Sequence, residues 1–166
     1  MFGLTSLGIF HTAISLLAAM AGAIALIRDG KISWDNNRGK VYVVATIVVC
    51  LTGFGIFQHG GFGKPHTLGV ITLVMLAVVF MAQTNDNLFG SLSPYVVTVG
   101  YSMTFFFHIV PGITETATRL PLDAPLASSP DDPNIQMAVG ICFVLLVIGA
   151  TIQVRKLRAK LTGGKP

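Results

Sequence analysis

The chain has 166 residues, of which 52% are hydrophobic and 11% are charged, and its formal net charge is +4. Soluble domains carry about a quarter charged residues, so this composition excludes an ordinary water-soluble domain or enzyme. It also excludes a nucleic-acid-binding domain, because the eleven basic residues lie beside apolar runs rather than among aromatic residues on a polar surface.

Five apolar segments are compatible with membrane-spanning helices. Three carry no charged residue over at least 18 positions, namely residues 2–27, 87–114 and 135–154. Two more, 41–57 and 66–82, are near the lower length limit, and the Gly- and Pro-containing stretch between them marks a tight turn. We therefore predict one domain, residues 1–166, that forms an all-α membrane bundle of about five helices: 4–27, 41–58, 66–83, 92–113 and 135–155.

A cleavable signal peptide is the alternative for the first segment, because small residues at 19–23 could imitate a cleavage site. However, residues 1–4 contain no basic residue, and the apolar stretch is longer than a signal peptide requires. We therefore predict a membrane helix.

The basic residues lie mostly on one side of the predicted bundle. Five spans place nine lysines and arginines beside the first connection and the C-terminus, whereas the other side receives Lys64 and Arg119. Because connections rich in lysine and arginine stay in the cytoplasm, we predict a bacterial inner-membrane protein with its C-terminus inside and its N-terminus outside. The outer side also receives an acidic loop with Glu115, Asp123, Asp131 and Asp132.

The four histidines are the only side chains in or beside the spans with obvious ligand or proton chemistry. His11 lies about two turns into the first span and His108 slightly more than one turn from the end of the fourth, which places both roughly 10 Å below the outer boundary. His59 ends the second span and His66 opens the third. All four are therefore predicted in the outer leaflet.

Helical spacing predicts that His11 and His108 face the bundle interior. His11 belongs to a stripe of small and polar residues at spacings of three and four, which favours close helix contact. The stripe comprises Thr5, Gly8, His11, Ser15, Ala18 and Gly22. His108 shares a face with Tyr101, Thr104 and Glu115.

Two inward imidazoles at one depth could ligate the iron of a haem b, or a transition metal together with His59 or His66. Lys64 and Arg119 would then pair with the haem propionates. The plainer alternative is that each histidine only donates a hydrogen bond between helices. Cys50 and Cys142 lie in apolar runs without CxxC spacing, so we predict that they are packing residues.

Three functions follow from these observations. The first is a small b-type-cytochrome-like or metal-binding membrane protein. The second is a cofactor-free structural or accessory subunit, whose small-residue stripe would contact a membrane protein partner or a second copy of the chain. The third is a transporter of protons or small solutes, which ranks last because no ionisable group is seen near the midplane. Whether the chain is an enzyme stays undecided.

Two stretches share the pattern of a known family: residues 34–43, Trp-Asp-Asn-Asn-Arg-Gly-Lys-Val-Tyr-Val, and residues 60–68, Gly-Gly-Phe-Gly-Lys-Pro-His-Thr-Leu. The second lacks the Lys-Ser/Thr pair of a phosphate-binding loop. Together they resemble a large bacterial family of predicted membrane proteins with a domain of unknown function. That family has a histidine early in helix one, His-Arg-Arg-x-Gly-Arg-x-Tyr entering helix two and Gly-Gly-Phe-Gly-x-x-His opening helix three.

The resemblance covers roughly residues 8–85, and it implies topology and candidate residues rather than an activity. The residues that it singles out are His11, Arg38, Gly39, Tyr42, Gly60, Gly61, Phe62, Gly63 and His66. The chain departs from the family at residues 35–37, Asp-Asn-Asn, where the family has histidine and arginine.

Overall fold

The computed structural model describes residues 5–57 and 61–163, which form helices and connections without a β-strand. Four helical segments in these residues are long and apolar enough to cross a membrane: α1 (Ser6–Asp29), α3 (Lys64–Thr84), Asn87–Arg119 and α6 (Pro133–Leu161). The predicted all-α class is confirmed, and the four helices are compatible with an integral membrane protein.

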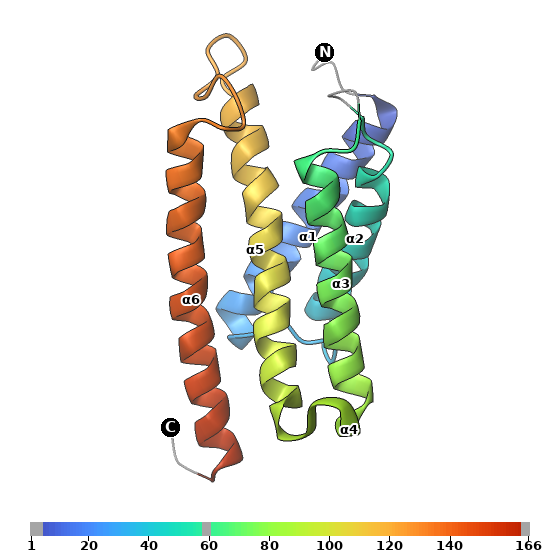
Figure 1. Ribbon diagram of the computed structural model, residues 1–166, viewed down its shortest axis with the longest axis vertical. Helices are drawn as coiled ribbons and strands as arrows, with labels where there is room; N and C mark the ends of the chain where they lie inside the picture. The colour runs from blue at the N-terminus through green and yellow to red at the C-terminus, as the bar shows by residue number, and fades with distance from the viewer. Residues whose placement is uncertain (1–4, 58–60, 164–166) are drawn as a thin grey trace.

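The remaining long helix, α2 (Asn37–Gly53), is the shortest of the set. Its 17 residues extend over about 25 Å at the usual rise per residue, against a hydrocarbon core of roughly 30 Å. It packs against α1 and α3 (Figure 1). A count of five spans therefore stays a prediction.

The long helices run alternately up and down (Figure 1). α1, α3 and α6 begin at one end of the bundle, whereas the α1–α2 connection and the end of α6 lie at the other. This arrangement brings eight of the nine basic residues predicted inside to one end, while Lys165 lies outside the described residues. Which end faces the cytoplasm stays a prediction.

Capping residues set helix boundaries that the apolar runs alone did not indicate. The Asn36 side chain accepts a hydrogen bond from the Gly39 N–H at 2.9 Å, so α2 begins four residues before the predicted position 41. Similarly, Thr5 caps α1, and Gly30 ends it in the left-handed region at φ 70°, which glycine adopts without strain.

The later helices extend beyond the predicted apolar segments. α5 (Ser93–Arg119) continues through Pro111 for six residues past position 113, and α6 reaches Leu161 through basic residues. Helices need not stop where the sequence becomes polar, because the backbone hydrogen bonds continue outside the apolar layer. The short α4 (Asp86–Phe89) and the 3₁₀ helix η1 (Gly90–Leu92), which join α3 to α5, were not predicted.

The buried core lies among α1, α2, α3 and α5. Its members are Ala21, Ala25, Ile32, Tyr42, Val43, Leu76, Val79 and Tyr101, with no contribution from the described part of α6. α1 approaches α2 and α5 closely at Gly22, where an added Cβ would lie 2.6 Å from the Phe105 ring and 2.9 Å from Tyr42. The predicted stripe is buried at Gly8, Ala18 and Gly22, whereas Thr5 at its end is exposed.

Candidate functional site

His108 lies in the interior and joins α5 to α2. Its Nε2 is 3.0 Å from Thr46 Oγ1, its ring packs edge-on against Tyr42 at 5.9 Å, and 9% of the residue is exposed. One turn away, Tyr42 Oη and Thr104 Oγ1 are 2.9 Å apart and make a second link between the two helices. The prediction that His108 faces inward is confirmed.

The hydrogen bonds of Thr46 fix the tautomer of His108. The Thr46 hydroxyl donates its single hydrogen to the Tyr42 carbonyl at 2.7 Å, so its oxygen must accept from the imidazole. Nε2 therefore carries the proton. In the neutral ring, Nδ1 is then an unprotonated hydrogen-bond acceptor.

This second nitrogen remains available. Within the described residues, Nδ1 of His108 makes no hydrogen bond, and the buried side-chain nitrogens and oxygens that lack a partner are His66 Nε2 and Ser93 Oγ. Nδ1 is therefore unpartnered but not fully enclosed by the described residues.

His108 lines an open groove of about 590 Å³ between α1, α5, α6 and the connection that precedes α6. The lining is mostly apolar and consists of Ala19, His108, Ile109, Gly112, Ile113, Thr116, Ala117, Leu126, Ala127, Asn134, Ile135 and Ala138. None of these described lining residues is charged. The groove therefore combines an apolar wall with one buried imidazole, and Thr116 and Asn134 supply its other polar side chains.

His11 makes an equivalent bond to α2 at a different place. Its Nδ1 is 2.9 Å from Thr52 Oγ1, and this hydroxyl donates to the Val48 carbonyl at 2.8 Å. By the same reasoning His11 donates from Nδ1, which leaves Nε2 unprotonated. The ring is half-buried.

The two imidazoles meet α2 at different heights. Their partners, Thr46 and Thr52, are six residues apart, which is about 9 Å along a helix and about a third of a turn around it. The binding of His11 and His108 to one iron or metal ion stays a prediction.

Among the described residues, His66 binds elsewhere and does not join this pair. His66 Nδ1 accepts a hydrogen bond from the Gly63 N–H at 3.1 Å, and its ring stacks between Phe57 and Phe62 at 5.1 and 5.0 Å. His66 thus stabilises the start of α3. His59 lies outside the described residues.

The predicted cations are both paired with carboxylates. Lys64 Nζ lies 2.5 Å from Asp131, and Arg119 lies 2.5 Å from Glu115 on the same helix. The described residues contain no group of three or more His, Cys, Asp or Glu side chains that could hold a metal ion. Cys50 is buried, Cys142 is half-buried, and both are free thiols.

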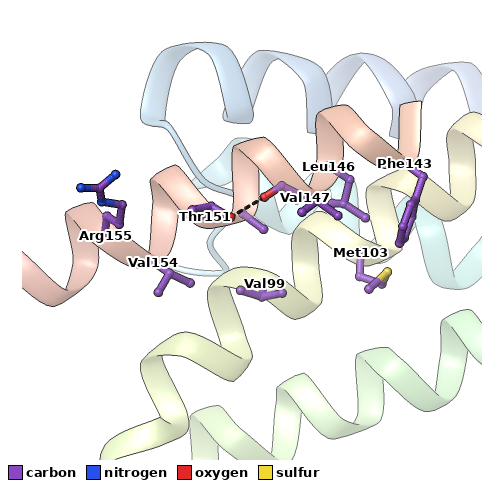
Figure 2. Close-up of a pocket in the computed structure, with 9 residues that line it drawn as sticks. Val99, Met103, Phe143, Leu146, Val147, Thr151, Val154 and Arg155 are labelled. Carbon is purple, nitrogen blue, oxygen red and sulfur yellow. Dashed lines mark hydrogen bonds between the residues drawn. The ribbon is translucent and has the colours of Figure 1, made fainter. Parts of the chain in front are cut away.

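A second groove between α5 and α6 offers less chemistry. It measures about 350 Å³ and is lined mainly by aliphatic side chains and Phe143 (Figure 2). The Thr151 hydroxyl there donates to the Val147 carbonyl of its own helix at 2.7 Å. None of the nine described residues that line this groove supplies an imidazole or a carboxylate.

Two residues that the resemblance singles out, Arg38 and Gly39, have structural roles at the opposite end of the bundle. Arg38 binds Asp29 through two hydrogen bonds, at 2.8 and 3.1 Å, and so fixes the α1–α2 connection. Asp29 lies beyond the apolar segment, and the hydrogen bond from Arg38 lowers the pKa of its carboxyl. A Cβ at Gly39 would lie 1.8 Å from the Ser33 carbonyl oxygen, so only glycine fits there.

Sequence reasoning missed the threonine partners of the two histidines. Tyr42 and Thr46 are four residues apart inside an apolar run, which places both on one face of α2. This spacing could have indicated a buried polar face opposite His108.

No protein family model, curated protein or solved structure matches this chain. The family resemblance therefore stays a prediction.

Proposed function

We propose that the chain is a membrane protein that binds a lipophilic small molecule in the groove beside His108. The observation that carries this proposal is an apolar groove of about 590 Å³ lined by a buried histidine whose Nδ1 has no partner among the described residues. Ligand sites are commonly apolar cavities of 300–1,000 Å³ with a few well-placed polar groups.

The imidazole is held in place before any ligand arrives. Thr46 fixes its Nε2, and the Tyr42 ring packs against it. A side chain fixed in this way loses little conformational entropy on binding, which favours affinity.

Gly112 provides a direct test, because it lines the groove and an added Cβ would meet nothing within 4 Å. A Gly112→Leu side chain should occupy the groove, and replacing glycine in a helix should raise stability by up to about 1 kcal/mol. Gly140→Leu on α6 is the matched control, since its Cβ also meets open space and Gly140 does not line the groove.

The measurement is mass spectrometry of organic extracts from the wild type and both variants, purified in the same mild detergent. We expect a small molecule to co-purify with the wild type and Gly140→Leu and to be depleted from Gly112→Leu. Identical extracts from all three proteins would contradict the proposal.

A b-type-cytochrome-like or metal-binding role is the second candidate. It is favoured by His11 and His108, each of which donates from one ring nitrogen and keeps the other unprotonated, as ligating histidines do. An absorption spectrum and elemental analysis of the purified protein test it. His11→Ala or His108→Ala should abolish a haem Soret band, whereas Lys64→Ala or Arg119→Ala should only weaken haem retention. A colourless, metal-free protein would contradict this role.

A further inference from the structure

We infer that the ligand of the His108 groove is a neutral lipophilic alcohol or phenol, which donates its hydroxyl hydrogen to His108 Nδ1. The inference rests on the proposed function and deepens it by naming the chemical class of the ligand.

The backbone carbonyl of Tyr42, which can only accept, fixes the direction of the hydrogen bond between Thr46 and His108. Thr46 donates to the carbonyl of Tyr42, and so accepts from His108 Nε2. Moving the imidazole proton to Nδ1 would leave Nε2 and the Thr46 oxygen as two facing acceptors, unless Thr46 gave up its backbone bond. Such a loss is costly in a buried site.

The hydrogen bond between Tyr42 and Thr104 does not change which ring nitrogen of His108 carries the proton. The Thr104 hydroxyl donates to the Tyr101 carbonyl at 2.9 Å, so Thr104 accepts from the Tyr42 hydroxyl. In both cases the threonine hydroxyl donates to a backbone carbonyl and its oxygen accepts from the neighbouring ring. His108 presents an acceptor to the groove, and a ligand must supply the donor.

The lining also excludes a charged head group. None of the described residues that line the groove is Lys, Arg, Asp or Glu, and moving a charge out of water without a partner costs many kcal/mol. A ketone, ester or ether that has no hydroxyl would place an acceptor against the acceptor Nδ1. A neutral hydroxyl on an apolar body satisfies both constraints.

The test uses 4-dodecylphenol and 4-dodecylanisole, which differ in that a methyl group replaces the phenolic hydrogen. Both are titrated into the wild-type protein in lipid nanodiscs, and binding is followed by thermal stabilisation. We expect the phenol to bind about tenfold more tightly than the anisole, which corresponds to one hydrogen bond in a buried site. Nitrogen-15 NMR of the histidine rings should show an unprotonated Nδ1 at His108 before the phenol is added.

One variant separates the possible causes. His108→Phe keeps a flat ring of similar size but has no nitrogen that could accept a hydrogen bond, so the preference for the phenol should disappear. If the anisole is rejected only because of its extra methyl group, the preference will persist in His108→Phe and the inference is wrong.

Two other outcomes distinguish this inference from the proposal on which it rests. Equal binding of both probes to the wild type, blocked by Gly112→Leu, would overturn the alcohol preference and leave the groove as a binding site. Binding of neither probe, or binding that Gly112→Leu does not reduce, would overturn both. A protonated Nδ1 in the wild type would overturn the alcohol preference.

Discussion

α6 is a candidate membrane span and α2 is not, but α2 is the more buried of the two helices. α6 is the most apolar of the four candidate spans, yet only 6% of its most apolar segment is buried. α2 is too short to be counted among those spans, but it buries six of its 17 residues and bonds to both interior histidines. In this bundle, the most hydrophobic helix is also the least buried of the four candidate spans, whereas small and polar residues mark contact between helices.

The same contrast holds for glycine. Gly39 in α2 lies against the backbone of Ser33, whereas Gly140 in α6 has nothing within 4 Å of its added Cβ. The helix that a hydropathy scan identifies most readily is therefore the one whose sequence is least constrained by packing.

The largest effect is expected at Gly39. Gly39→Ala would place a Cβ 1.8 Å from the Ser33 carbonyl oxygen and 2.5 Å from its carbon. Because these are backbone atoms, the α1–α2 connection must shift, and we expect a loss of about 3 kcal/mol or more. Thermal unfolding in mild detergent measures it, with Gly140→Ala as a control that should be neutral or slightly stabilising. Equal stability of Gly39→Ala and the wild type would contradict the packing of this connection.

The next effect is expected where α1 meets α2 and α5. A leucine at Gly22 would overlap Phe105 and Tyr42, and one at the fully buried Ala18 has no space. Each variant should lose about 1–3 kcal/mol. Gly149→Leu on α6, where an added Cβ meets nothing, is the control. If Gly22→Leu and Gly149→Leu unfold at the same temperature, the small-residue stripe of α1 faces lipid.

The sequence predicted the all-α class, the five long helices and the inward direction of His108, because charge-free length and helical spacing are local properties. It did not predict the start of α2, because a cap such as Asn36 is recognised by one hydrogen bond and not by hydropathy. Nor did it predict that His11 and His108 contact α2 at different heights. That arrangement depends on how α1, α2 and α5 are shifted along one another, and the local sequence pattern of one helix does not predict such a shift.

A smaller effect is expected from the buried hydroxyl pair of Tyr42 and Thr104. Tyr42→Phe and Thr104→Val should each lose about 1 kcal/mol, and a double-mutant cycle should show coupling because the two side chains share one hydrogen bond. Thr151→Val on α6 should change stability little, since its hydroxyl is exposed and bonds within its own helix. Strictly additive losses at Tyr42 and Thr104 would show that their bond contributes nothing.

The smallest effect is expected on the outer face of α6. Ile148 is 52% exposed, whereas Val79 in α3 is 0% exposed. An Ile148 side chain that faces lipid keeps that contact when the bundle dissociates within the membrane, because lipid tails are as apolar as neighbouring side chains. Ile148→Ala should therefore change stability by less than about 0.5 kcal/mol. Val79→Ala removes fewer carbon atoms but should cost about 1–2 kcal/mol, because it leaves a cavity.

Unfolding by denaturant in one detergent, at several protein concentrations, compares the two variants. A cost at Ile148 that equals the cost at Val79 and grows with protein concentration would contradict lipid exposure of α6. It would show that a second copy of the chain covers this face.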